Sequence, residues 1–333
     1  MTDTLTMWGP ITRILSPGGA RGKLTVLFFH RVFAEADPMM PGEPTAAWFD
    51  RMLGWATSQF KLLPLGEAVE RLKSGTLPPA AAALTFDDGY RDNLEVAAPI
   101  LQRRRVPATF FITTGFLDGG IMFNDIVTET LRRTALSDVA LPELGLAALP
   151  LHDWAGRRAA VGQVLRAVKY LPFEQRDAAV AELAARCRVS LPTDLMMRSA
   201  QVRELAGLGF ELGAHTRSHP ILRRLPAEQA RAEIAGGRDD LAAITGRRIG
   251  LFAYPNGRRH QDFDELHRDM ARDAGFDAAF TTEPGTADVR SDLWQLPRFT
   301  PWDRSAGRFR MRLWLNHFTN PAAPSAAPAP SHA

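Results

Sequence analysis

The chain has 333 residues, of which 45% are hydrophobic and 23% are charged, a composition typical of a soluble globular protein with a sizeable core. Its net charge of +3 is not concentrated in any one stretch, so nucleic acid is not an expected partner. Cys187 is the only cysteine, which excludes an internal disulfide.

The N-terminal sequence carries an acidic residue early and lacks the sustained apolar run of a secretory signal. No segment reaches the roughly 18 apolar residues that are needed to span a bilayer. The sequence therefore predicts a cytoplasmic protein without an integral membrane segment.

Short β-rich runs alternate with helical patterns along most of the chain. We predict strands at residues 24–30, 81–86, 108–113, 210–215, 249–254 and 276–282. We predict helices at residues 45–59, with Thr45 as the N-cap, and at 66–73 and 91–104. Strands that alternate with helices form βα units around a parallel sheet. The expected fold is an α/β distorted (β/α) barrel, with seven strands as the expected number, and a doubly wound open sheet is the alternative.

The alternation breaks between about residues 116 and 200. Three helical stretches follow one another there, and no strand of comparable quality lies among them. This favours a helical insertion on a βα loop, where barrel enzymes place elements that shape the substrate site. The expected organisation is an N-terminal extension (1–23), one domain (24–319) that contains the insertion, and a disordered Pro/Ala/Ser-rich tail (320–333).

Two adjacent carboxylates, Asp87 and Asp88, follow the apolar strand at residues 81–86. Carboxylates this close repel each other unless a cation or a shared proton compensates. One of them can bind a metal ion while the other reaches a water molecule on that metal. The alternative is an Asp-Asp-Gly turn that caps the following helix.

Two histidines, His215 and His219, follow the strand predicted at residues 210–215 and are separated by four positions. This spacing brings both rings to one side of a turn, as a divalent ion requires. Pro220 disfavours helical geometry at His219, so we expect a tight loop. Because the carboxyl ends of parallel barrel strands share one face, the aspartate pair and the histidine pair can converge there. Two imidazoles and one carboxylate leave positions open for water and substrate, a pattern typical of catalytic metal sites.

Three segments, TFDDGY (85–90), HTRSH (215–219) and FAYPNG (252–257), resemble the first three motifs of the polysaccharide deacetylases, the NodB-homology domain of carbohydrate esterase family 4. The similarity covers roughly residues 24 to 300. It implies a distorted (β/α) barrel, a divalent metal ion, expected to be Zn²⁺, and an N-acetylated glycan as substrate. It further implies that Asp87 is the general base and that Asp88, His215 and His219 bind the metal.

The sequence departs from the family pattern in its third motif. The arginine that orients the base in the family is replaced by Ala253, and we expect Arg298, from another loop, to supply that charge. Asn256 stands where the family has tyrosine, and its backbone N–H is the candidate oxyanion donor, although it can equally be a turn residue. Tyr90 either lines the sugar site or packs, and Trp302 is a candidate for the wall that receives the acetyl methyl group.

The general acid has two candidates. Leu315-Asn316-His317 matches the letters of the family's late motif, but it lies on an amphipathic helical stretch, and we expect His317 to be a surface residue there. His30 ends the strand at residues 24–30 and resembles the histidine that opens the rearranged deacetylases of exopolysaccharide systems. We therefore favour His30 as the acid.

The resemblance implies hydrolysis of N-acetyl groups on an amino-sugar polysaccharide or its precursor. Two alternatives remain open at this point. One is an amidohydrolase of a small ureide or formamide, since such enzymes share these motifs. The other is a carbohydrate-binding protein without catalytic activity, which would require a broken set of metal ligands.

Overall fold

The computed structural model describes residues 9–301 and 303–319. The predicted tail, the first eight residues of the predicted N-terminal extension and Trp302 lie outside them. The centre of the fold is a sheet of seven parallel strands in the order β1-β3-β4-β7-β8-β9, with β2 paired to β3. The strands are β1 (Thr25–Phe29), β2 (Lys61–Leu62), β3 (Ala81–Phe86), β4 (Thr109–Ile112), β7 (Glu211–Ala214), β8 (Leu251–Ala253) and β9 (Ala278–Phe280).

An irregular segment between the two edge strands completes the distorted barrel. Leu296 forms a parallel bridge with Phe280 in β9, and Phe299 forms one with Leu27 in β1. The Phe299 N–H donates to the Val26 carbonyl at 2.7 Å, and the Leu296 N–H donates to the Ala279 carbonyl at 2.9 Å. The seven strands and the barrel predicted from the sequence are confirmed, and residues 296–299 take the place of an eighth strand.

Alternation along the strands separates two hydrophobic clusters. In β3, Ala82, Leu84 and Phe86 pack with the surrounding helices, whereas Ala81 and Ala83 belong to a second cluster with residues of β1, β4, β8 and β9. Since successive side chains of a strand point to opposite faces, the second cluster fills the barrel interior. The small alanines leave space in this interior for larger side chains.

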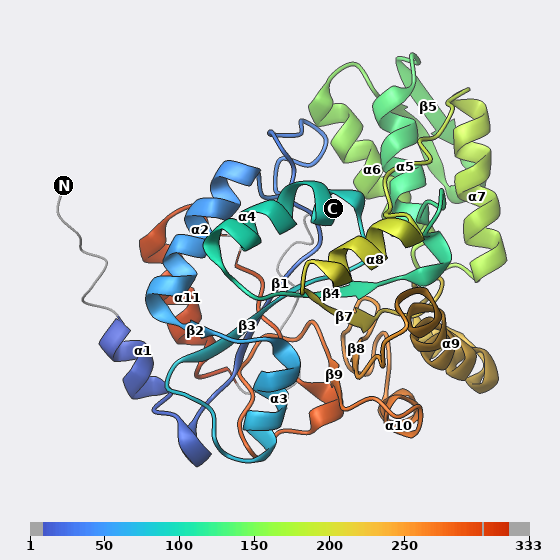
Figure 1. The fold of residues 1–333 in the computed structure, drawn as a ribbon. Helices are drawn as coiled ribbons and strands as arrows, with labels where there is room; N and C mark the ends of the chain where they lie inside the picture. The colour runs from blue at the N-terminus through green and yellow to red at the C-terminus, as the bar shows by residue number, and fades with distance from the viewer. Residues whose placement is uncertain (1–8, 302, 320–333) are drawn as a thin grey trace.

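Helices surround the sheet on its outer face (Figure 1). They are α1 (Gly9–Leu15), α2 (Ala46–Gln59), α4 (Ala98–Arg104), α8 (Ser199–Gly207), α9 (Ala227–Thr245), α10 (Glu265–Asp273) and α11 (Ala306–Asn316). The apolar side chains of α3 (Leu65–Lys73) pack instead with the second cluster, that of the barrel interior. Thr45 caps α2 as predicted, because its side chain accepts a hydrogen bond from the Trp48 N–H. The helix predicted at residues 91–104 is present, and it contains a π-helical turn (Asn93–Ala97) before α4.

The insertion gathers on one side of the barrel (Figure 1). It contains α5 (Phe123–Arg133), α6 (Trp154–Val168) and α7 (Phe173–Arg186), together with an antiparallel pair, β5 (Asp138–Leu141) and β6 (Leu146–Pro150). The sequence showed no strand of comparable quality in this region, and this antiparallel pair was not predicted. The pair is short, and only the alternating burial of β5 follows a strand pattern.

The insertion has a hydrophobic cluster of its own, built mainly from α5, α6, α7 and the β5–β6 pair. Cys187 belongs to this cluster and is buried. Among the helices of residues 9–301 and 303–319, none is long and apolar enough to cross a membrane.

Candidate active site

Asp87 and Asp88 occupy the turn that follows β3. The Asp87 N–H donates to the Phe29 carbonyl of β1 at 2.9 Å, which extends the sheet by one residue. Asp88 and Gly89 have positive φ angles of 76° and 88°, so the chain bends sharply there. A Cβ atom at Gly89 would lie 3.2 Å from Ile112 Cγ2, and the close approach of β4 therefore favours glycine at this position.

The side chain of Asp87 continues the interior face of β3 and meets Arg298. The guanidinium of Arg298 donates to both carboxylate oxygens of Asp87 at 2.7 Å, and its Nε donates to the Thr281 carbonyl at 2.8 Å. Arg298 is fully buried, and its guanidinium lies 4.6 Å from the centre of the Phe28 ring. Burial alone would raise the pKa of Asp87, but the charges of Arg298 and His215 and the hydrogen bonds from Arg298 together hold this pKa below its usual range. Asp87 is therefore ionised at neutral pH.

His215 and His219 lie in the loop that follows β7. His215 Nδ1 is 2.7 Å from the Ala253 carbonyl of β8, so this nitrogen carries a proton and Nε2 is the nitrogen that faces Asp88. Thr216 and His219 both have positive φ angles, 63° and 52°, and the Thr216 hydroxyl accepts from the His219 N–H at 3.1 Å. The loop is tight and non-helical, as Pro220 predicts.

Asp88, His215 and His219 converge. Their potential ligand atoms all lie within 4.8 Å of one another, and Asp88 Oδ1 is 3.4 Å from His215 Nε2 and 3.5 Å from His219 Nε2. Asp88 Oδ1 is buried and accepts no hydrogen bond from the described residues. A buried carboxylate oxygen without a partner is costly, and a cation between these three side chains would satisfy it.

The protonation states suit a cation. The neighbouring imidazoles, His215 first among them, lower the pKa of Asp88 despite its burial, so this carboxylate is ionised. Asp87 and Asp88 in turn raise the pKa of His215 although its burial opposes this, and a metal ion that binds there would displace the proton of its Nε2. Burial lowers the pKa of His219 to about 4, which leaves its imidazole neutral at pH 7. An ionised carboxylate and a neutral imidazole are the forms that bind metal ions. The donor set therefore fits a divalent ion.

His30 follows β1 on the same face of the barrel. The Asn93 side chain donates to the His30 carbonyl at 2.8 Å, and Asp92 accepts from the Val32 N–H at 3.1 Å and from Arg31 Nε at 2.8 Å. The charge of His30 contributes to lowering the pKa of both Asp87 and Asp88. The segment that carries His30 is thus held from the turn after β3, beside the carboxylate pair.

Sequence reasoning missed Glu43. Its Oε2 atom is buried and has no hydrogen-bond partner in the described parts of the chain, and burial raises the pKa of the carboxyl group. The strongest opposing influence on this pKa is the charge of His30. A lone glutamate in a Gly-Glu-Pro loop carries no signal in the sequence, since only the fold brings that loop beside His30.

Three further candidates differ in their placement. Tyr90 packs: it is 3% exposed, and its hydroxyl donates to Asp125 Oδ2 at 3.0 Å. Asn256 has a positive φ of 58° and lies in the turn after β8, where its carbonyl accepts from the Thr282 hydroxyl. Trp302 is outside the described residues.

The prediction that His317 is a surface residue was wrong. It is 3% exposed, and neither ring nitrogen has a hydrogen-bond partner among the described residues. It lies at the end of α11 with Thr12 of α1 and Gln59 at the end of α2. The helical periodicity marks the apolar face of α11, but α1 and α2 also cover its end. Since Gln59 precedes β2, His317 is at the amino-terminal end of the barrel, opposite the carboxylate pair.

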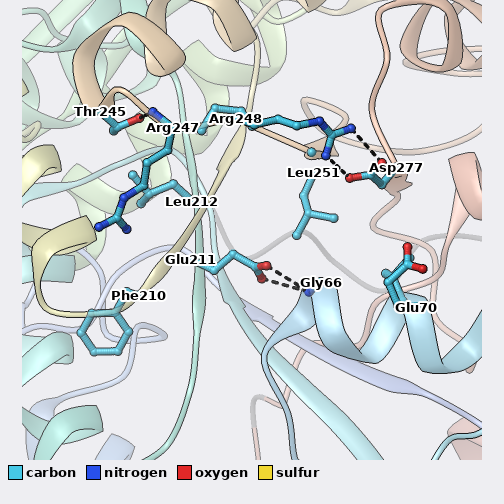
Figure 2. A pocket seen from close by; sticks show the side chains of 13 residues that line it. Gly66, Glu70, Phe210, Glu211, Leu212, Thr245, Arg247, Arg248, Leu251 and Asp277 are labelled. Atoms are coloured by element: carbon cyan, nitrogen blue, oxygen red, sulfur yellow. Dashed lines mark hydrogen bonds and ion pairs between the residues drawn. The ribbon is translucent and has the colours of Figure 1, made fainter.

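A cavity of about 310 Å³ also lies at that opposite end (Figure 2). It is lined by the first residues of β7 and β8, Glu211 and Leu251, and by Gly66 of α3. The Glu211 carboxylate accepts from the Gly66 N–H at 3.1 Å, and Arg248 pairs with Asp277 across the rim. The cavity therefore has no part in the site described above.

The model of the polysaccharide deacetylase family matches residues 74–141 and 173–279 of this chain. A protein of Bacillus subtilis, YxkH, whose name places it among the polysaccharide deacetylases, is 20% identical over 278 residues, which are 83% of this chain and 70% of that protein.

Solved structures share the fold. The deacetylase PplD of Streptococcus pyogenes, in complex with acetate, has a TM-score of 0.55 at 19% identity, over 84% of this chain and 92% of its own. IcaB from Ammonifex degensii has a TM-score of 0.55 at 19% identity, over 86% of this chain and 97% of its own. The deacetylase domain of BpsB from Bordetella bronchiseptica has a TM-score of 0.53 at 19% identity, over 84% of this chain and 95% of its own. The chain therefore belongs to the polysaccharide deacetylase family, whose members are hydrolases of the N-acetyl amide bond.

Proposed function

We propose that this chain is a metal-dependent hydrolase that removes N-acetyl groups from an amino-sugar polysaccharide or its precursor. The observation that carries the proposal is the convergence of Asp88, His215 and His219 around an unpartnered carboxylate oxygen, directly beside the ionised Asp87. The family supplies the reaction class, and the donor set supports the metal.

Asp88, His215 and His219 would hold the ion. Two imidazoles and one carboxylate leave coordination positions open, which is typical of catalytic zinc sites, and Zn²⁺ is the ion that we expect. When bound, such an ion polarises a carbonyl oxygen and lowers the pKa of a bound water molecule toward neutrality.

Asp87 would act as the general base. Arg298 keeps its carboxylate ionised and fixes its orientation through two parallel hydrogen bonds. Each carboxylate oxygen retains a further lone pair, so Asp87 can accept the proton of the attacking water molecule while paired. Arg298, in the segment at residues 296–299, would thus orient the base. It takes the role of the family's arginine, whose position is occupied by Ala253 in this chain.

His30 would act as the general acid and donate a proton to the leaving amine. Asn93 and Asp92 hold the backbone at residues 30 and 32, which keeps the segment that carries the imidazole near the carboxylate pair. The backbone N–H of Asn256, in the left-handed turn after β8, is the candidate donor to the oxyanion.

The decisive experiment measures acetate release from N-acetylglucosamine oligomers by the purified protein, before and after metal removal and after reloading with Zn²⁺. Ring opening of a cyclic ureide is measured in parallel. We expect metal-dependent acetate release and no ureide hydrolysis. Ureide turnover without acetate release would assign the chain to the alternative class of hydrolase.

The roles of the two aspartates are separated by matched variants. Asp87→Asn is expected to lower kcat by about 10²- to 10⁴-fold, the range of a lost general base, and to retain the metal. Asp88→Asn is expected to lose both activity and metal, as measured by metal analysis of the purified protein. Normal turnover by Asp87→Asn would overturn its assignment as the base.

A further inference from the structure

Tyr170 lies in the turn between α6 and α7 of the insertion and is 42% exposed. Its hydroxyl accepts a hydrogen bond from Gln261 Nε2 at 2.5 Å. This hydrogen bond joins the turn between α6 and α7 to a barrel loop that lies 91 residues later in the sequence. The ring is therefore held in one place although much of its surface is open to solvent.

The loops that Tyr170 meets are those that carry the candidate site. Gln261 follows Asn256 by five residues in the loop after β8. Arg224 follows His219 by five residues in the loop after β7, and its guanidinium lies 5.7 Å from the centre of the Tyr170 ring. Both loops start at the carboxyl ends of their strands, so Tyr170 contacts the barrel at the same end as the candidate site.

Lys169 gives independent support for this docking. Burial lowers the pKa of its ammonium group, while the charges of Asp262 and Arg258, two further residues of the loop after β8, act on this pKa in opposite directions, which places Lys169 near that loop. The ammonium group also lies 5.7 Å from the centre of the Tyr170 ring. The turn at residues 169–170 thus rests on that loop through two neighbouring side chains.

A tyrosine ring held at its hydroxyl presents a large amphipathic surface at little cost in conformational entropy. A pyranose offers a complementary shape, with a flat face of C–H groups and a rim of hydroxyls. Two nearby side chains can donate hydrogen bonds to those hydroxyls, the amide of Gln261 and the guanidinium of Arg224. Arg224 has no ion-pair partner among the described residues.

We propose that Tyr170, Arg224 and Gln261 form a subsite for a second sugar of the glycan chain, apart from the sugar whose acetyl group is removed. This rests on the proposed function, since it assumes a polymer that crosses the active face. The insertion then selects for chain length: binding energy gained at a remote sugar lowers KM for long substrates.

Trp154 is the matched control. It belongs to the same insertion, is 44% exposed, and lies 5.8 Å from the guanidinium of Arg157, much as Tyr170 lies beside Arg224. It starts the 15-residue helix α6, whereas Tyr170 follows the end of that helix. The two aromatic residues are thus about 20 Å apart along the helix axis. No hydrogen bond, ion pair or ring contact joins Trp154 to the loops after β7 and β8 in the described residues.

The test uses the full-length chain with Tyr170→Ala, Tyr170→Phe and Trp154→Ala. Initial rates are measured on the hexamer and the dimer of N-acetylglucosamine. We expect Tyr170→Ala to raise KM for the hexamer roughly tenfold more than KM for the dimer, with kcat retained. Tyr170→Phe should keep most of the preference for the hexamer, and Trp154→Ala should match the wild type.

Calorimetric binding of the hexamer to the Asp87→Asn variant, with and without Tyr170→Ala, separates this inference from the proposed function. Weaker binding on loss of Tyr170 supports the subsite even if the wild type releases no acetate. Equal hexamer binding with and without Tyr170 overturns the subsite, even if the wild type is an active deacetylase. A loss that is the same for dimer and hexamer also overturns it, because it would indicate a structural role.

Discussion

Asp87 and Asp88 are consecutive in the chain but lie in opposite chemical environments. Asp87 is paired with a permanent cation, the Arg298 guanidinium, through two hydrogen bonds of 2.7 Å. Asp88 faces two imidazoles and keeps one buried oxygen without a partner. Neighbouring carboxylates can take different roles when their surroundings differ in this way, one as base and one as metal ligand.

The pair between Arg298 and Asp87 is expected to affect stability as well as catalysis. Arg298→Met leaves a buried, ionised carboxylate, and breaking a buried pair in this way typically costs about 3–5 kcal/mol. We expect a lower free energy of unfolding in urea by this amount, together with a large loss of kcat.

Arg248→Met is the control for that prediction. Arg248 also pairs with its partner, Asp277, through two hydrogen bonds, but its side chain is 66% exposed. Exposed pairs contribute about 0–1 kcal/mol, so its loss should hardly change unfolding or turnover. Equal destabilisation by the two variants would contradict the argument.

The two candidate acids are separated by the same substitution at each position. His30→Gln is expected to lower kcat by about 10²- to 10⁴-fold, since His30 lies beside the carboxylate pair. His317→Gln should retain full turnover, because that imidazole is buried at the opposite end of the barrel. The measurement is the rate of acetate release with saturating substrate, and a loss confined to His317→Gln would reverse the assignment.

The residues that converge at the candidate metal site are those that a local sequence pattern had already indicated. Asp88, His215 and His219 follow apolar strands, and parallel strands bring such positions to one face. Glu43 could not be found this way, since no strand or spacing marks it. The two parallel hydrogen bonds of Arg298 could not be predicted from the sequence either. They depend on the path of an irregular segment, which has no hydrophobic periodicity from which that path could be inferred.

At the scale of elements, a buried hydrogen bond joins the insertion to the barrel next to the aspartate turn. Asp125 of α5 accepts a hydrogen bond from the Tyr90 hydroxyl, one residue after the turn formed by Asp87, Asp88 and Gly89. Burial raises the pKa of Asp125 from its ordinary value of 3.8 to about 7. The folded protein therefore binds this proton more tightly than the unfolded chain does.

The consequence is a stability that depends on pH. The contribution of Asp125 is fully present below about pH 4 and is lost as the pH rises through about 7, where the buried carboxyl group must ionise. Asp125→Asn keeps the shape and an acceptor for Tyr90 without this ionisation. We expect the unfolding free energy of the variant, relative to the wild type, to increase from pH 5 to pH 8, as measured by urea titration. A difference that stays constant over this range would exclude the raised pKa.

Prediction from the sequence worked well for elements with a long apolar run or a clear helical period. The strand at residues 81–86 agrees with β3 at both ends, and the helix at residues 45–59 agrees with α2 and its cap. The β5–β6 pair was missed because Leu146–Pro150 is rich in alanine and leucine and is largely exposed. Its pairing depends on the hydrophobic cluster of the insertion, which is a tertiary effect.

At the scale of the whole molecule, the proposed metal site connects distant parts of the chain. Asp88 follows β3, His215 and His219 follow β7, and the Nδ1 of His215 contacts the Ala253 carbonyl of β8. More than 120 residues, including the insertion, separate Asp88 from His215 in sequence. An ion held by these side chains would join the ends of β3 and β7 in the folded state alone, with β8 supporting one of the ligands.

Binding that occurs only in the folded state stabilises it by mass action. At a free Zn²⁺ concentration about 100 times the Kd, the expected gain is about 2.7 kcal/mol, which should appear as a rise in Tm. Asp87→Asn should keep this rise, since Asp87 is not a ligand, and Asp88→Asn should lose it. The measurement is thermal unfolding of chelator-treated protein with and without added Zn²⁺. Because it requires no substrate, a Zn²⁺-dependent rise in Tm that persists in Asp88→Asn would show that zinc binds elsewhere, whatever the activity of the enzyme.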